Sequence, residues 1–224
     1  MSAEHALTIP LSVPAIEPIE AGDLVYFTGP LFTARPRWYQ RILDEGRPVP
    51  VDLQALGANV LLHAGPVMRR TPSGEWEMAA MVPMPDWIAD GAGRNVARIL
   101  DSLDLRALIG KGELQGSAGL CQRHQCLHLI TFGTWNNFAR RVRRVRDVAW
   151  LELGLTEAMW VFDVDRMGPF VVETDIHGHS LYAQFREERE RRIQAVLQAH
   201  GLDTFRYSTP GYPVFLRRQG GGND

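Results

Sequence analysis

Ala107-Leu108-Ile109-Gly110-Lys111-Gly112 is the stretch that decides the fold. Its apolar half is typical of a buried strand that is about to leave a sheet. The two glycines allow a sharp turn and a close approach of the backbone to a ligand. The single ammonium of Lys111 suits a carboxylate or a phosphate. A plain turn with a solvated lysine is the alternative interpretation at this point.

The phosphate-binding P-loop is excluded by the neighbouring residues. That motif needs a glycine five residues before Gly110 and a serine or threonine after the lysine. Leu105 and Gly112 occupy those two positions. The anion that Lys111 would bind therefore has to be identified from other parts of the chain.

Further apolar runs predict a sheet with interspersed helices. We expect strands over 24–28, 59–64, 107–110, 126–132, 158–164 and 170–175, and helices over 37–45, 94–103, 118–123, 138–145 and 184–200. Residues 67–93 are expected to be irregular, and residues 165–169 to form a turn between two strands. This mixture predicts the α/β class.

Composition excludes several classes of protein. The chain has 224 residues and a formal net charge of −2, so no global basic field attracts nucleic acid. No apolar stretch approaches the length of a membrane span, and no signal-peptide pattern opens the sequence. We therefore expect a cytoplasmic protein without nucleic-acid or membrane partners. The two cysteines, Cys121 and Cys126, are too few for a disulfide framework or a four-cysteine iron–sulfur cluster in this chain.

An ordered set of motifs resembles one family. The set comprises Gly22-Asp23-Leu24-Val25, Gly29 to Arg35, Arg41, Gly46, Pro50 to Leu53, Gly65-Pro66, Ile109 to Gly112, Leu153 to Val164, Phe170 to Asp175 and Gly178. In this order and spacing it resembles the beta subunit of tartrate dehydratase and the equivalent C-terminal domain of class I fumarases. The resemblance covers roughly residues 7 to 182. It divides the chain into a domain over 1–182 and a helical extension with a flexible tail over 183–224.

The resemblance implies a fold, a reaction and a partner. The fold would be a swivelling β/β/α three-layer domain, here with an extra C-terminal helix. The reaction would be a hydration or dehydration of a small hydroxy di- or carboxylic acid. The [4Fe–4S] cluster would belong to a separate alpha subunit and not to this chain, with a homodimer or heterotetramer as the assembly.

The same resemblance implies the residues that hold the substrate. Arg35 matches the arginine of the Thr-Gly-Arg-Asp motif, Lys111 the lysine of Gly-Lys-Gly, and Arg41 the arginine of Ala-His-Lys-Arg. Two cations suit a dicarboxylate, and an arginine offers it a bidentate fork. Thr33 is a further candidate for ligand binding, with pairing across the sheet as its alternative role. No catalytic residue and no metal ligand is assigned.

Several residues depart from the family pattern. Pro36 replaces an aspartate, and Trp38-Tyr39-Gln40 replaces Ala-His-Lys, so the motif histidine is absent. Residues 82–93 lack the expected threonines and serine. Arg94 is a candidate replacement for a carboxylate-binding arginine nearby. These departures support a second hypothesis: a catalytically degenerate domain that serves ligand binding or subunit assembly.

The apolar stretch Met78 to Trp87 suggests a change of specificity. It could cap a more hydrophobic ligand, or it could pack onto the core. If it caps the site, we expect the preference to shift from tartrate towards a less polar acid.

Other clusters have simpler interpretations. Cys121, His124, Cys126 and His128 have zinc-like spacing, but buried thiols with surface histidines are the alternative. The arginines between Arg140 and Arg146 suggest a solvated basic helix face, with an acidic partner or nucleic acid as the alternative. The 184–200 segment is expected to be a salt-bridged surface helix, or else a subunit contact.

Overall fold

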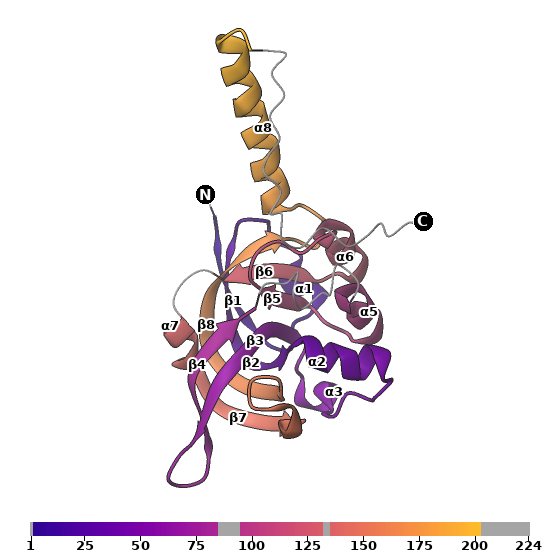
Figure 1. The fold of residues 1–224 in the computed structure, drawn as a ribbon, viewed down its shortest axis with the longest axis vertical. Coiled ribbons are helices and arrows are strands. Elements are labelled where there is room, and N and C mark those ends of the chain that lie inside the picture. The colour runs from indigo at the N-terminus through magenta and orange to yellow at the C-terminus, as the bar shows by residue number, and fades with distance from the viewer. Residues whose placement is uncertain (1, 85–94, 132–134, 203–224) are drawn as a thin grey trace, which may run out of the picture. The chain divides into compact units, whose positions relative to one another are not determined.

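A computed structural model of the chain describes residues 2–84, 95–131 and 135–202. The chain divides into two compact units, Met1–Ala183 and Gln184–Asp224. The first unit combines a large sheet with helices (Figure 1). The predicted α/β class is therefore confirmed. In the described part of the chain, no helix has both the length and the apolar character that crossing a membrane requires.

One eight-stranded sheet organises the first unit. Its order is β1-β2-β3-β5-β6-β8-β7, and β4 pairs with the outer part of β3. The strands are β1 (Glu4–Thr8), β2 (Leu24–Ala34), β3 (Val60–Arg70), β4 (Trp76–Pro83), β5 (Ala107–Gly110), β6 (Leu127–Thr131), β7 (Val142–Ala149) and β8 (Met159–Thr174). Strands β2, β3, β5 and β6 run parallel. Strand β8 is antiparallel to both β6 and β2, so the path β2-β3-β5-β6-β8 closes on itself.

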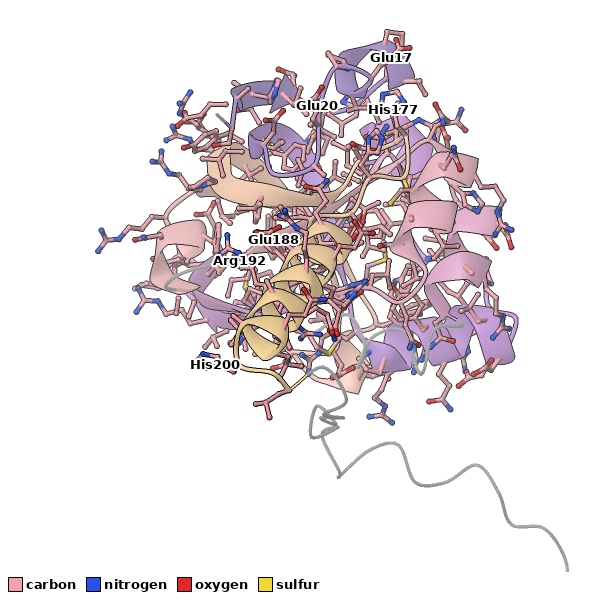
Figure 2. The ribbon with its side chains drawn as sticks, turned by 90° about the horizontal axis from the view of Figure 1, so that it is seen from above. Glu17, Glu20, His177, Glu188, Arg192 and His200 are labelled. Atoms are coloured by element: carbon pink, nitrogen blue, oxygen red, sulfur yellow. The ribbon has the colours of Figure 1, made fainter. Side chains whose placement is uncertain are left out.

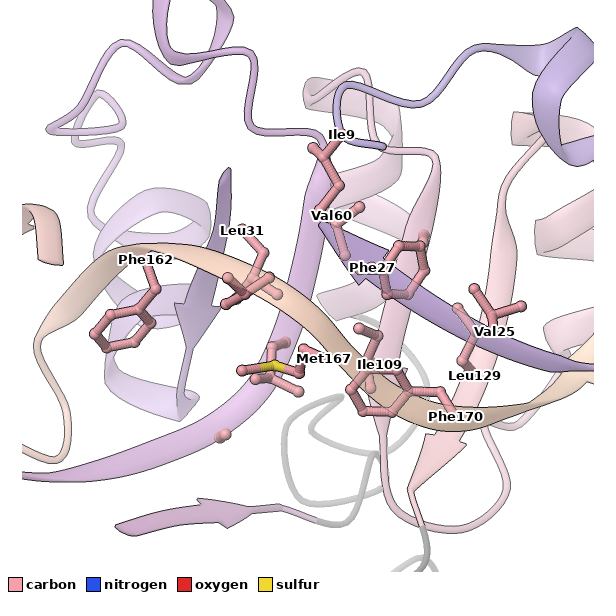
Figure 3. Close-up of a cluster of buried hydrophobic side chains, with 14 of the residues drawn as sticks. Ile9, Val25, Phe27, Leu31, Val60, Ile109, Leu129, Phe162, Met167 and Phe170 are labelled. Atoms are coloured by element: carbon pink, nitrogen blue, oxygen red, sulfur yellow. The ribbon is translucent and has the colours of Figure 1, made fainter. Parts of the chain in front are cut away.

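Two hydrophobic clusters cover the two faces of this sheet. Alternate residues of a strand point to opposite faces, which explains why neighbours such as Leu61 and Leu62 belong to different clusters. The cluster inside the closed path is built from apolar side chains of β2, β3, β5, β6 and β8 (Figure 3). Each large side chain buried in this way contributes about 1.5–3 kcal/mol.

Helices cover the second face (Figure 1). Trp38 and Tyr39 pack there from α2 (Pro36–Tyr39), and Val96 and Ile99 from α5 (Asn95–Ser102). The other helical elements of this unit are α1 (Val13–Ile16), the π-helical segment η1 (Gln40–Asp44), α3 (Leu53–Leu56), α6 (Ser117–His124), α7 (Trp135–Ala139) and the 3-10 segment η2 (Leu151–Leu153).

The arginine-rich stretch is a strand, and the predicted helix over 138–145 is wrong. The helix α7 ends at Ala139, and β7 then pairs antiparallel with β8. Val142, Val145 and Val148 are three residues apart, which resembles a helical spacing. Two register shifts, between Val142 and Arg144 and between Val145 and Asp147, return these valines to the same face of the strand.

Residues 67–84 are also more regular than the sequence suggested. Gly65 and Pro66 lie inside β3 and do not end it, because β3 continues to Arg70 and forms an antiparallel hairpin with β4. Met78 and Met81 are buried in the first core cluster and Met84 in the second. The apolar character of this stretch is therefore used for packing. The part of Met78 to Trp87 beyond Met84 lies outside the described residues.

The predicted turn over 165–169 is wrong, because β8 is continuous from Met159 to Thr174. Gly168, part of the turn signal, is required by a close approach. A Cβ atom at this position would lie 2.6 Å from the carbonyl oxygen of Val25 on β2, and its φ is +149°. A glycine permits this contact between two backbones.

The second unit contains most of helix α8 (Leu181–Ala199), close to the predicted range 184–200. Its surface carries ion pairs within the helix. Arg192 Nε donates to Glu188 Oε1 at 2.6 Å (Figure 2). Arg191 also pairs with Glu188. Such i,i+3 and i,i+4 pairs stabilise an exposed helix by a few tenths of a kcal/mol each.

Candidate functional site

The predicted cations Arg35 and Lys111 follow two parallel strands of the sheet. In the register, Ala34 of β2 lies beside His63 of β3, and Leu62 of β3 lies beside Ile109 of β5. Extending the first pair by one residue places Arg35 beside Ala64, and extending the second pair by two residues places Ala64 beside Lys111. Arg35, Ala64 and Lys111 therefore share one row across the sheet. Arg35 and Lys111 are therefore about two strand spacings apart, roughly 10 Å between backbones.

This row lies at the carboxyl ends of the parallel strands β2, β5 and β6, where the chain leaves each strand. The same register places Thr131, the last residue of β6, beside Lys111. Lys111 is exposed, and Gly112 after it has a φ of +87°, which turns the chain away from the strand. The structure thus brings the two cations to one edge of the sheet.

The backbone of Arg35 is fixed where β2 meets α2. Arg35 is the N-cap residue of α2 in an extended conformation, and Pro36 occupies the first helical turn. The carbonyl oxygen of Arg35 accepts hydrogen bonds from the amides of Trp38, at 3.0 Å, and Tyr39, at 3.3 Å. The strand-to-helix junction therefore presents Arg35 at a defined place.

Glu157 fixes the side chain of Arg35. Both Nε and Nη2 of Arg35 lie 3.0 Å from Oε1 of Glu157. The two side chains are 20% and 21% exposed, so this charge-assisted contact is largely shielded from water. The partners are 122 residues apart in the chain, and sequence reasoning did not find Glu157.

Gly65 and Thr156 complete the contact around Arg35. A Cβ atom on Gly65 would lie 2.4 Å from Cγ2 of Thr156 and 3.4 Å from Cζ of Arg35. A side chain at position 65 would therefore displace the segment that carries Glu157. Gly65 is needed for space.

Tyr39, which stands where the family motif has a histidine, contacts a buried histidine of β3. The hydroxyl of Tyr39 is hydrogen-bonded to Nε2 of His63, and both side chains are buried. The pair ties helix α2 to strand β3, next to the backbone of Arg35. The sequence contained one signal for this pair: His63 interrupts the apolar run Val60 to Ala64. A polar side chain inside a buried strand needs a hydrogen-bond partner.

Arg41 and Thr33, two other candidates, have partners within the protein. Arg41 Nη1 lies 2.5 Å from Oε1 of Glu152, and its guanidinium lies 5.2 Å from the centre of the Trp150 ring. The Arg41 hydrogen bond lowers the pKa of the Glu152 carboxyl. Thr33 is fully buried, and its Oγ1 accepts a hydrogen bond from the amide of Trp160 at 3.2 Å. Thr33 therefore joins β2 to β8. The remaining candidate, Arg94, lies outside the described residues.

The zinc alternative has no support in the structure. Within residues 2–84, 95–131 and 135–202, no group of three or more His, Cys, Asp or Glu side chains is placed to hold a metal ion. Cys121 and Cys126 are free thiols that are buried in the second core cluster. His128 is buried as well, where Nδ1 contacts the carboxylate of Glu173. The four residues with zinc-like spacing thus do not converge on a zinc ion in the described part of the chain.

Comparisons with known proteins show similarity over most of the chain. The family model described as Fumarase C-terminus matches residues 5–185. The L(+)-tartrate dehydratase subunit beta of Escherichia coli strain K12 is 30% identical over 201 residues, which covers 86% of this chain and 95% of the relative. A protein of Methanocaldococcus jannaschii, described as a putative L(+)-tartrate dehydratase subunit beta, is 24% identical over 196 residues, covering 81% and 93%.

A third relative is a longer protein. The putative fumarate hydratase class I of Geobacillus stearothermophilus is 29% identical over 189 residues, which covers 84% of this chain but 35% of the relative. The match therefore corresponds to one part of that protein. The family match extends over most of the chain and includes both Arg35 and Lys111. The chain belongs to the fumarase C-terminus family.

Proposed function

We propose that this chain is the beta subunit of an iron–sulfur-dependent hydro-lyase that acts on a small hydroxy di- or carboxylic acid. The observation that carries the proposal is the position of Arg35 and Lys111 on one row at the carboxyl ends of parallel strands. The relatives named as tartrate dehydratase beta subunits, which match over most of their length, support it further.

In this proposal the chain binds and orients the substrate. Lys111 offers an ammonium to one carboxylate, and Arg35 offers a planar guanidinium to the other. Two fixed cations at one edge favour a ligand with two anionic ends over a ligand with one. A swivelling movement of this domain would then bring the bound acid to the partner subunit.

The [4Fe–4S] cluster belongs to the partner in this proposal. The two cysteines of this chain are buried in the core, and the described residues offer no converging ligand set. We therefore expect the purified single chain to be colourless, without stoichiometric iron, and to have no hydratase activity.

Co-expression with a neighbouring gene for an alpha subunit tests the proposal. We expect the two chains to co-purify, the complex to contain iron, and the complex to turn over at least one acid in a screen of L(+)-tartrate, malate and related hydroxy acids. Iron–sulfur absorbance in the single chain would contradict the assignment of the cluster to the partner.

A domain that binds a ligand or assembles subunits without catalysis is the second candidate. It is favoured by one specific observation: Arg35 already has a carboxylate partner, Glu157, within the chain. A complex with an intact cluster that turns over none of these acids would support this second function over the first.

A further inference from the structure

Arg35 uses one of its two hydrogen-bonding edges inside the protein. Its Nε and Nη2 atoms both contact Oε1 of Glu157 at 3.0 Å. A planar guanidinium can offer a carboxylate either the Nε–Nη2 edge or the Nη1–Nη2 edge. Because Glu157 takes the first edge, a ligand carboxylate has to meet the second. The ion pair thus sets the direction from which a ligand reaches Arg35.

Glu157 itself is held in place by its neighbours. Its amide donates to the carbonyl oxygen of Gly154 at 3.0 Å, and the preceding residue, Thr156, packs against Gly65. The contact between Thr156 and Gly65 leaves no room for the Glu157 segment to shift towards β3. The carboxylate therefore acts as a fixed point for a long and otherwise mobile side chain.

The contribution of the Arg35–Glu157 ion pair to stability is reduced by one unsatisfied atom. Oε2 of Glu157 is buried, and no group in the described residues donates a hydrogen bond to it. A buried acceptor without a donor costs about 1–3 kcal/mol, because it has lost its water. Costs of this kind are typical of functional sites, where local rules of stability are broken.

We propose that Glu157 is a positioning residue for substrate recognition. It directs the Nη1–Nη2 edge of Arg35 to one carboxylate of a ligand whose other carboxylate meets Lys111. This inference rests on the proposed function, and it adds the residue that makes the site selective for dicarboxylates. The physical basis is pre-organisation: an arginine that is already fixed loses less conformational entropy when the ligand binds.

Three substitutions separate the position of the Glu157 carboxylate from its charge. Glu157→Gln keeps the shape and the accepting Oε1 but removes the charge. Glu157→Asp keeps the charge but withdraws the carboxylate by one methylene. Glu157→Ala removes both. A charge effect changes the affinity of every anion by a similar factor, whereas a positioning effect changes the ratio between anions with two carboxylates and anions with one.

The experiment measures the affinities of the full chain for succinate and for butyrate by calorimetry, alone and in complex with its partner. Succinate and butyrate have equal carbon numbers but two carboxylates and one. We expect the wild type and Glu157→Gln to prefer succinate to a similar degree. In Glu157→Asp and Glu157→Ala, we expect the preference to fall about tenfold. Glu77→Ala removes an exposed glutamate paired with Arg69 and serves as the matched control, with an unchanged ratio.

The outcomes distinguish the inference from the proposed function. If all Glu157 variants keep the wild-type ratio while Lys111→Ala loses it, the inference is wrong and the proposed function stands. If Glu157→Gln behaves like Glu157→Ala, the role is electrostatic and the inference is also wrong. If the wild type shows no preference for succinate and Lys111→Ala changes nothing, the paired-cation function fails and the inference fails with it.

Discussion

His128 Nδ1 lies 2.9 Å from Oε2 of Glu173, and both side chains are fully buried. Three hydroxyl groups also donate to this carboxylate: Ser180 to Oε1 at 2.6 Å, and Ser117, at 3.2 Å, and Thr174, at 2.5 Å, to Oε2. His128 lies near the start of β6, where it pairs with Thr174 of β8. The network is therefore at the opposite end of β6 from Thr131. The network therefore links α6, β6 and β8 at that end of the sheet.

This network makes the stability of the protein sensitive to acid. Burial raises the pKa of Glu173, but the hydrogen bond and charge of His128, together with the hydroxyls of Ser180 and Thr174, lower it from 4.5 to about 2. The unfolded state therefore binds more protons than the folded state between these values. Stability from Glu173 is fully present above the unfolded pKa of 4.5 and is lost as the pH falls towards 2.

We expect the free energy of unfolding to fall by roughly 3 kcal/mol over this range on account of Glu173. Urea unfolding between neutral and acidic pH measures it. Glu173→Gln should be less stable at pH 7 and should show a flatter dependence below the unfolded pKa of the glutamate. Identical acid profiles for the variant and the wild type would show that Glu173 does not carry the effect.

Gly65→Ala should destabilise the protein by about 1–3 kcal/mol, because the new methyl group would meet Cγ2 of Thr156 at 2.4 Å. The same shift should weaken the hold of Glu157 on Arg35. Thermal or urea unfolding measures the first effect.

A second substitution tests the cause of this loss. Thr156→Ser removes the clashing methyl group, so Gly65→Ala combined with Thr156→Ser should recover part of the stability. Gly119→Ala on α6 is the matched control, since a Cβ atom there would have no neighbour within 4 Å. If Gly65→Ala were as well tolerated as Gly119→Ala, the close packing described around Arg35 would be incorrect.

The two thiols should be unreactive in the folded protein. Cys121 and Cys126 are fully buried, and the neighbouring Cys126 thiol together with burial raises the pKa of Cys121. Because the thiolate is the reactive species, we expect no rapid labelling of the native chain by an aromatic disulfide reagent. Unfolding in urea should release both thiols of the chain. Rapid labelling under native conditions would contradict the buried placement.

The sequence predicted those parts of the fold that depend on local pattern. The strand over Ala107–Gly110 and the helices near 94–103 and 184–200 were placed within a few residues, because a run of apolar residues or a helical period is visible locally. The valines of β7 were misread because two register shifts change the apparent period of that strand. The hairpin of β3 and β4 was missed because Gly65-Pro66 resembles a strand end.

Contacts between distant segments could not be read from local pattern. The sequence indicated Arg35 and Lys111 through motifs, and the register then placed them on one row. It did not indicate Glu157, whose importance depends on a contact across 122 residues, nor the pairing of Tyr39 with His63. Such pairs arise from the order of strands in the sheet, which no single segment contains.

The role of Arg35 and Lys111 as a pair of carboxylate-binding cations is the central claim. Each is expected to make a charge-assisted hydrogen bond to the substrate, worth about 1.5–3 kcal/mol. Arg98→Ala is a matched control, because this arginine lies on α5 in an exposed ion pair with Asp44. Its loss should leave substrate binding unchanged.

The most direct test is kcat/KM of the two-subunit complex for the hydroxy acid that it turns over best. We expect Arg35→Ala and Lys111→Ala each to lower kcat/KM by about 10- to 150-fold, the equivalent of that free energy, largely through a higher KM. Wild-type values for both variants, in a complex that keeps its iron and its activity, would contradict the assignment of these residues to the substrate.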